Sequence, residues 1–247
     1  MKPEHSEIAD KLVMAAKRLC MELEGMRFSS PVTHVYQPLD YAWDVHERYL
    51  RTFGNTPKRV LFLGMNPGPW GMVQTGVPFG EISAVRDWMG LQGEVGHPDG
   101  EHPKRVVEGF SCKRSEVSGR RLWGLFAERW PEATGFFAGH FVANFCPLVW
   151  MEESGRNRTP DKLPAAEMMA VEAACVNHLR AVVDALSPQW CVGVGKFATE
   201  KFELLRDGSE TWKTATILHP SPASPAANRG WAEAAVRQLV DQGVWER

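Results

Sequence analysis

The sequence lacks the features that mark several large classes of protein. Its five cysteines are odd in number, widely spaced and form no CxxC pair, which argues against a disulfide framework, a zinc site or an iron–sulfur cluster. No apolar run approaches the roughly 20 residues of a membrane span, and the amino terminus lacks a signal-peptide core. The net charge of −2 provides no global basic field, so any contact with nucleic acid must come from a local patch.

Catalytic signatures that depend on a fixed spacing are also missing. No Ser/His/Asp set, pair of carboxylates or cluster of metal ligands stands out, so we expect neither a metal nor another cofactor. Gly193-Val194-Gly195-Lys196 fits neither the Walker nor the dinucleotide pattern and is interpreted as a tight turn. With 44% apolar and 23% charged residues, the composition is that of a globular protein. We expect one monomeric α/β domain over residues 1–247, cytoplasmic, or nuclear if the source is eukaryotic.

Four short apolar segments predict the strands of a parallel sheet. Each is followed by a helical pattern, and this alternation is typical of a three-layer α/β/α fold in which helices cover both faces of a central four-stranded parallel sheet. The strands are expected at residues 59–63, 140–145, 190–195 and 214–218. Amphipathic segments at 6–24 and 41–53 predict amino-terminal helices packed on this domain. Further helices are expected at 83–90, 118–130, 164–186, 196–205 and 228–241, the first two capped by Ser83 and Ser118.

Two irregular stretches interrupt the alternation. Residues 92–117 and 152–160 are rich in glycine, proline and charge without a periodic pattern. Long ordered loops often carry function. A solvated surface insertion explains residues 92–117 at least equally well, so both interpretations stay open.

The loop after the first predicted strand is the strongest candidate for a site. It reads Gly64-Met65-Asn66-Pro67-Gly68-Pro69-Trp70-Gly71, and its three glycines and two prolines make a stiff turn with little side-chain cover. Because the carboxyl ends of parallel strands share one edge of a sheet, Asn66, Asn144 and His219 should converge on one cleft. The side-chain amide of Asn66 neither gains nor loses a proton near neutral pH, so it can orient a water but cannot act as a general base.

Each candidate also has an ordinary structural interpretation. Asn66 could simply stabilise the turn, and Phe79, in a Gly/Pro loop, could be either a core residue or a stacking platform. Asn144 stands in an apolar strand, where its amide must bond either a neighbouring loop or a ligand. His219 precedes a stiff Pro/Ser loop leading to a helix, where a neutral imidazole can stabilise an anion. The convergence, more than any single residue, favours a functional site.

Several motifs, in order along the chain, resemble those of the single-strand-selective monofunctional uracil-DNA glycosylases. Residues 64–69 together with the loop at 74–80 resemble the first motif of that family. His219-Pro220-Ser221-Pro222 resembles the second motif. The likeness covers roughly residues 28–245 and includes the segments 101–105, 115–119, 141–148, 154–160 and 228–231.

The resemblance implies the uracil-DNA glycosylase superfamily and its four-stranded parallel sheet. It implies hydrolysis of the bond between sugar and base for uracil and for some C5-modified uracils in DNA, as a step of base excision repair. Deaminated purines are a further candidate substrate, and the expected partners are single- and double-stranded DNA containing uracil; the preference among these bases and strands stays open. No cofactor and no lyase step are implied. By resemblance, Asn66 positions the water, Phe79 stacks on the base, Asn144 reads the pyrimidine edge and His219 stabilises the departing base. Met65 and Gly68 complete the substrate site, where the missing side chain of Gly68 leaves room beside uracil C5.

The DNA contacts that the resemblance implies differ in one respect from the family pattern. Family members can carry a basic residue in the wedge loop of Ser221 and Pro222, where this chain has Ala223, so Arg229 or the loop backbone would have to act instead. Phosphate contacts are expected from basic side chains of the irregular stretches, namely Arg156, Arg158, Lys104 and Arg105. Two alternatives stay open: a non-catalytic binder of damaged or single-stranded DNA, and a hydrolase of free nucleosides or nucleotides.

Overall fold

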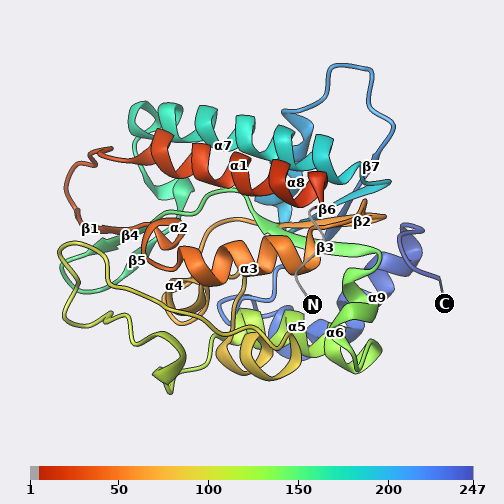
Figure 1. The fold of residues 1–247 in the computed structure, drawn as a ribbon, viewed down its shortest axis with the longest axis horizontal. Coiled ribbons are helices and arrows are strands. Elements are labelled where there is room, and N and C mark those ends of the chain that lie inside the picture. The colour runs from red at the N-terminus through yellow and green to blue at the C-terminus, as the bar shows by residue number, and fades with distance from the viewer. Residues whose placement is uncertain (1–5, 247) are drawn as a thin grey trace.

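The centre of the fold is a parallel sheet with the strand order β3-β2-β6-β7 (Figure 1). The computed structural model describes residues 6–246. The strands are β2 (Val60–Gly64), β3 (His140–Asn144), β6 (Trp190–Val194) and β7 (Lys213–Ile217). Both β2 and β3 are buried along their whole length, as expected for strands covered on both faces. The four-stranded parallel sheet predicted from the sequence is confirmed.

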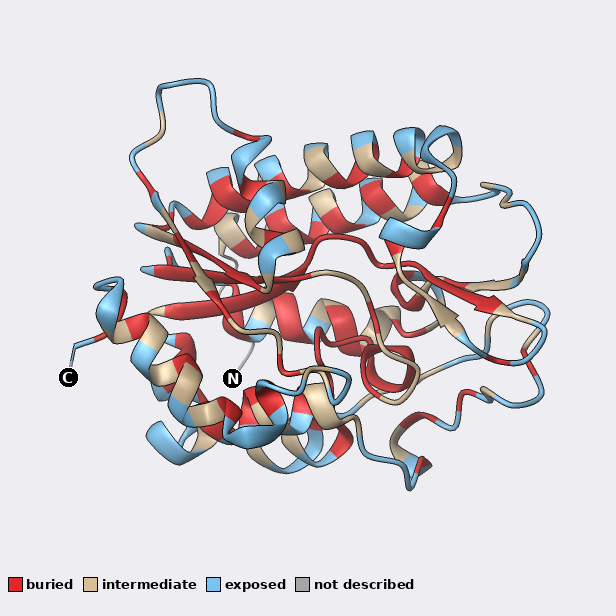
Figure 2. Ribbon diagram, turned by 180° about the vertical axis from the view of Figure 1, so that it is seen from behind, coloured by how far each residue is buried: buried red, intermediate tan, exposed pale blue. Residues whose placement is uncertain are grey.

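Helices cover both faces of this sheet, which gives the three layers seen from behind in Figure 2. One layer contains α1 (Glu7–Leu23), packed along α7 (Ala165–Leu186), together with α8 (Lys196–Glu203). The opposite layer contains α3 (Trp43–Phe53), α5 (Val117–Arg129), α6 (Ala133–Phe137) and α9 (Trp231–Asp241). A core of buried side chains extends from Leu12 on α1 to Trp245 after α9. No helix within residues 6–246 is long and apolar enough to cross a membrane.

A second sheet lies beside the first and was not predicted. It consists of β1 (Val32–Tyr36), β4 (Val149–Glu152) and β5 (Asn157–Arg158), all antiparallel. The stretch expected to be irregular at 152–160 is therefore largely a hairpin. Strand β5 of this sheet is too short to show an alternating pattern, and a bulge interrupts the pairing of β1 with β4 between Val32 and His34. These two features explain why periodicity did not reveal the sheet.

Both predicted serine caps are wrong. Ser118 lies inside the first turn of α5, whose cap position is Glu116. Ser83 makes no cap hydrogen bond and instead donates to Glu81 Oε2 at 2.6 Å. The same carboxylate oxygen accepts from the Ala84 N–H at 3.1 Å, so Glu81 takes the capping role at the short π-helical turn Ala84–Trp88.

The stretch expected to be irregular at 92–117 is firmly attached to the protein, although before α5 begins at Val117 it contains only a short 3₁₀ turn, Gly109–Ser111. The Tyr36 hydroxyl accepts from the His102 N–H at 2.6 Å and donates to the Arg105 carbonyl at 3.0 Å. Buried Gln74, on the short helix α4 (Met72–Thr75), bonds the carbonyls of Pro69 and Val106. Its amide oxygen accepts from the N–H groups of Glu108 and Gly109. The segment is therefore tied to the loop that follows β2.

Candidate active site

A cavity of about 280 Å³ lies at the carboxyl edge of the parallel sheet. Six of the residues predicted to contact the base or the DNA line it: Met65, Asn66, Gly68, Phe79, His219 and Ser221. The rest of the lining comes from the turn after β2, the start of α5 and the β5 hairpin, namely Pro67, Glu116, Ser118, Asn157 and Thr159. The edge therefore collects side chains from distant parts of the sequence.

His219 is held in one tautomer by its own loop. Its Nδ1 accepts a hydrogen bond from the Ser221 N–H at 3.1 Å, and an atom that accepts from a backbone N–H must carry a lone pair. The ring proton of the neutral imidazole is therefore on Nε2. Burial lowers the pKa of His219 below its ordinary value of 6.5, which favours that neutral form. The site thus contains an uncharged N–H donor.

Phe79 has an unusual backbone that is fixed by its neighbours. Its φ of 51° is rare for a residue with a side chain, and the strain is balanced by bonds to its carbonyl. That oxygen accepts from Trp123 Nε1 at 3.0 Å and from the Glu81 N–H at 2.6 Å. The Phe79 ring centroid lies 6.2 Å from that of His219. Strained backbone held in this way is common at functional sites.

Asn66 is fixed through one end of its amide. Its Nδ2 donates to the Leu148 carbonyl at 3.2 Å, and within residues 6–246 no hydrogen bond is made by Oδ1. The adjoining backbone continues the pairing of β2 with the segment after β3, since the Met65 carbonyl accepts from the Cys146 N–H at 3.0 Å. Asn66 therefore presents a positioned oxygen that can accept from a water.

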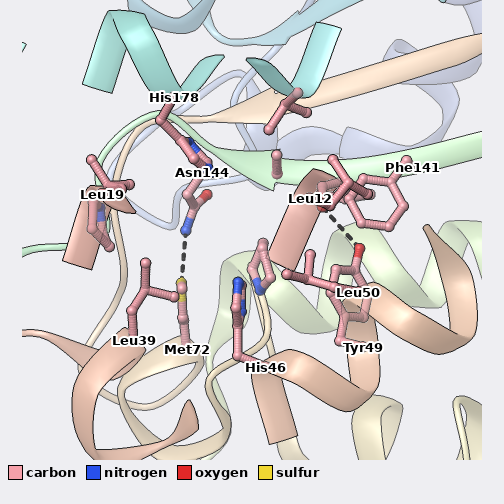
Figure 3. Close-up of a pocket in the computed structure, with 15 residues that line it drawn as sticks. Leu12, Leu19, Leu39, His46, Tyr49, Leu50, Met72, Phe141, Asn144 and His178 are labelled. Atoms are coloured by element: carbon pink, nitrogen blue, oxygen red, sulfur yellow. Dashed lines mark hydrogen bonds between the residues drawn. The ribbon is translucent and has the colours of Figure 1, made fainter. Parts of the chain in front are cut away.

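Asn144 is next to the cavity but is not part of its lining. It is 8% exposed, and its Nδ2 donates to Met72 Sδ at 3.3 Å in a separate, smaller cavity of about 30 Å³ (Figure 3). Its Oδ1 is buried without a partner. A side chain at Gly64 would collide with this oxygen and approach Phe79 Cε2 to 2.5 Å, so Asn144 and Phe79 meet across that glycine. A buried amide oxygen left unpaired costs about 1–3 kcal/mol.

Glu116 was missed by the sequence reasoning. Its carboxyl lies against Gly68 and Gly71, where a Cβ on either glycine would collide with a carboxyl oxygen. Its Oε2 is buried without a partner. Burial, reinforced by the charge of Glu81, raises the pKa of Glu116 to about 7. A lone glutamate in a charged loop carries no spacing signal, although the resemblance included residues 115–119.

The room expected beside Gly68 is therefore not empty. The space that its side chain would take is occupied by the Glu116 carboxyl. Gly68 is also absent from the glycines of residues 6–246 with positive φ, so close packing, and not backbone conformation, requires a glycine here.

The loop after β7 projects from the cavity as a stiff, exposed turn. Arg121, on α5, donates to the Pro220 carbonyl and to Asn228 Oδ1, both at 2.9 Å. Asn228 Nδ2 donates to the Pro222 carbonyl at 2.9 Å, and the Ala223 N–H bonds Ser221 Oγ at 3.1 Å. Pro222 and Ala223 are exposed at its tip. The sequence reasoning missed Arg121 because it lies 99 residues from its partner.

The predicted basic contacts are not equally available. Arg156, Arg229 and Lys104 are exposed. Arg158 is bound within the protein, since it donates to Glu152 Oε1 and to the Lys162 carbonyl, both at 2.7 Å. Arg105 lies 5.2 Å from the ring centroid of Trp70, and Arg114 lies over the same ring at 4.4 Å.

Comparisons with known proteins agree with this architecture. Residues 52–240 match the family described as the Uracil DNA glycosylase superfamily. The chain is 44% identical over 245 residues to the single-strand selective monofunctional uracil-DNA glycosylase of Rattus norvegicus, with 99% of this chain and 88% of the relative covered. The Bos taurus protein of that name is also 44% identical, over 98% of this chain and 89% of the relative. The chain therefore belongs to the single-strand selective monofunctional uracil-DNA glycosylases of this superfamily.

A solved structure supports the fold. The crystal structure of SMUG2 from Pedobacter heparinus superposes with a TM-score of 0.68 over 96% of this chain and 97% of its own. At 16% sequence identity, that likeness concerns the fold alone.

Proposed function

We propose that this protein removes uracil from DNA by hydrolysing the bond between the base and its sugar, without a lyase step. C5-modified uracils, and deaminated purines, are the further substrates that we propose, in single and double strands alike. The unpartnered Oδ1 of Asn144 beside the Phe79 ring carries the proposal, because a buried acceptor next to an aromatic face suits a base that offers an N–H. Family membership and the 44% identity to glycosylases of that name support it.

The target base has to leave the helical stack before the cavity can hold it. Stacking on Phe79 would offset part of that cost by about 1–3 kcal/mol. The rigid backbone of Phe79 means that little further order is lost when the base arrives. The exposed tip of the β7 loop, Pro222 and Ala223, is suited to fill the space that the base leaves. Arg156 and Arg229 are then the proposed phosphate contacts.

Recognition of uracil is assigned to the amide of Asn144. Its Oδ1 would accept from uracil N3–H, and its Nδ2 would exchange the weak bond to Met72 Sδ for one to uracil O4. Cytosine presents an acceptor at N3 and a donor at C4, so it would leave buried polar atoms unpaired. Sites that hydrogen-bond their substrate reject such analogues strongly.

Bond cleavage leaves negative charge on the base and positive charge on the sugar. The Nε2–H of His219 would donate to the uracil anion as it forms, and a fixed donor of this kind contributes roughly 3–4 kcal/mol. The cation-like sugar needs only a weakly activated water, which Asn66 Oδ1 can orient. An amide therefore suffices where a carboxylate would otherwise act as base.

A base-release assay tests the proposal against the two alternatives. Oligonucleotides with one uracil, the same strands with cytosine or thymine, and free deoxyuridine are compared under single-turnover conditions. We expect release from the uracil strand alone. Binding of the uracil strand without release would identify a non-catalytic binder, and release from deoxyuridine would identify a nucleoside hydrolase.

The Asn144→Asp variant makes this assay specific for base recognition. A carboxylate offers two acceptors, so it pairs with N3–H but repels O4. We expect uracil release to fall by about ten- to a hundredfold, the effect of leaving a buried polar group unpaired. Release at the parent rate would show that Asn144 has only a structural role.

A further inference from the structure

The Glu116 carboxyl is a built feature of the cavity wall that the proposed reaction does not use. Both Gly68 and Gly71 lack side chains where the carboxyl lies, and either Cβ would collide with it. Its Oε2 is sealed against Gly71 without a hydrogen bond, while Oε1 lies against Gly68 at the cavity. A buried carboxyl without a partner is costly, and a ligand can supply the missing bond.

The charged groups around Glu116 leave it without a counter-ion. Glu81, from the segment before the π-helical turn, is the group whose charge acts on it, and its effect is repulsive. His219, from the end of β7, shares the cavity but is neutral, as its lowered pKa indicates. The lining residues from the β5 hairpin, Asn157 and Thr159, are uncharged.

The nearby arginines are engaged elsewhere. Arg114 lies over Trp70, and Arg120 donates to Ser115 Oγ. Arg121 bonds the β7 loop. Within residues 6–246 no salt bridge involves Glu116. A hydrogen-bond donor on a ligand is therefore the partner that this carboxyl lacks.

The proposed pose of the base leaves its C5 edge without a contact, and Glu116 is among the lining residues that can meet it. With O2 at His219, and N3–H and O4 at Asn144, the edge left over is the one that carries C5 and C6. Gly68 and Glu116 belong to the lining that none of these contacts uses. This step rests on the proposed function, since it takes the base to be a uracil held by those two side chains.

We propose that Glu116 is a specificity-determining residue: its Oε1 accepts a hydrogen bond from a donor carried on C5 of the base, such as the hydroxyl of a hydroxymethyl group. An unsubstituted uracil leaves the carboxyl unpaired. The charged form accepts such a bond more strongly than the neutral acid does, whereas the neutral acid can donate to an acceptor such as a formyl oxygen. The charge state of Glu116 therefore sets which C5 groups are preferred.

The sign of the pH effect follows from this chemistry. Because the pKa of Glu116 is about 7, the carboxyl changes charge between pH 5.5 and 8. The ratio of hydroxymethyluracil to uracil release should rise with pH across that range, by about tenfold. The ratio of formyluracil to uracil release should fall. Protonation of His219 affects all three bases alike, so it cancels in both ratios.

Single-turnover release from matched oligonucleotides with uracil, hydroxymethyluracil or formyluracil tests this. Glu116→Gln keeps the shape but cannot ionise, so both ratios should become independent of pH. The matched control Glu128→Gln removes an exposed carboxyl from the same helix and should keep the parent profile. A parent ratio that does not change with pH, or a Glu116→Gln variant that keeps the parent profile, would overturn the inference.

A second variant keeps Glu116 in place in case its replacement disturbs folding. Glu81→Gln removes the repelling charge, so the midpoint of the ratio should move to lower pH, and an unmoved midpoint counts against the inference. Failure of the proposed function looks different, because the parent would then release no uracil at any pH.

Discussion

Two loops at the same edge of the sheet are stiff for different physical reasons. The β2 loop (residues 64–71) and the β7 loop (residues 219–225) both contain prolines and both line the cavity. In the β7 loop, backbone and side-chain groups are paired, with Arg121 and Asn228 bonding its carbonyls. In the β2 loop, two glycines are packed against a carboxyl that has no partner. The β2 loop therefore packs against a buried carboxyl, that of Glu116 at the start of α5, which lacks a partner until a ligand supplies one.

This difference separates two tasks of a glycosylase site. The paired β7 loop presents a neutral donor, His219, that can serve any departing base. Against the β2 loop lies the unpaired Glu116 carboxyl, beside the cavity, where it distinguishes bases by their substituents. Breaking the β7 loop should lower all rates together, whereas changing the contact between the β2 loop and Glu116 should alter the ratio between substrates.

The largest expected effect comes from the donor of the β7 loop. His219→Ala removes the Nε2–H that would meet the uracil anion, so single-turnover release should fall by roughly two to three decades. Its thermal unfolding should match that of the parent, since the ring is half-buried and accepts a single bond from Ser221. A rate within a few-fold of the parent would remove His219 from the reaction.

The unpaired Glu116 carboxyl, packed against the β2 loop, should affect folding in a pH-dependent way. The pKa of Glu116 is raised from 4.5 to about 7 in the folded protein, so its neutral form is the stable one. Its favourable contribution is complete below pH 4.5 and is lost as the pH rises toward 7 and beyond. Glu116→Gln has no such titration. Between pH 5 and 8, the variant should gain about 2–3 kcal/mol of unfolding free energy relative to the parent.

Denaturant unfolding of both proteins at several pH values measures this difference. Both proteins share all other ionisable groups, so the contributions of these groups to the pH dependence of the unfolding free energy cancel in the comparison. A constant difference between pH 5 and 8 would show that Glu116 titrates in the folded protein as it does in the unfolded chain.

Sequence patterns predicted the parallel sheet because buried strands between helices leave short continuous apolar segments, as in β2 and β3. They also predicted that Asn66, Asn144 and His219 would converge, because strand ends share an edge; Asn66 and His219 line the cavity, whereas Asn144 lies next to it and Phe79 was expected there from the resemblance. Glu116 and Arg121 could not be found in this way, since each acts through a contact with a loop distant in sequence. The role of Gly68 was misjudged for the same reason: a glycine signals missing bulk, but its neighbours in the fold determine what occupies the space.

Close packing of the β2 loop can be tested by adding one methyl group. Gly68→Ala should cost about 1–3 kcal/mol of unfolding free energy, as overpacking does, and most of that cost should disappear in a Glu116→Ala background. Gly124→Ala is the control, because a Cβ there meets nothing within 4 Å; on helix α5 it should be neutral or slightly stabilising. An equal cost of Gly68→Ala in both backgrounds would mean that the glycine serves something other than the contact with Glu116.

The smallest expected effect tests whether the β7 loop acts on all bases alike. Arg121→Ala removes the bonds to Pro220 and Asn228, which should cost about 1 kcal/mol of stability and slow uracil release several-fold by loosening the loop. Hydroxymethyluracil release should slow by the same factor, so the ratio of the two release rates stays at the parent value.

Arg121→Lys separates the effect of loosening the loop from a long-range effect of charge, because lysine keeps the charge but lacks the planar fork that spans two acceptors. We expect Arg121→Lys to release uracil as slowly as Arg121→Ala does. Release by Arg121→Lys at the parent rate would assign the effect to attraction of DNA by the charge. A changed ratio of the two substrates in Arg121→Ala would show that the two loops do not divide their tasks as proposed.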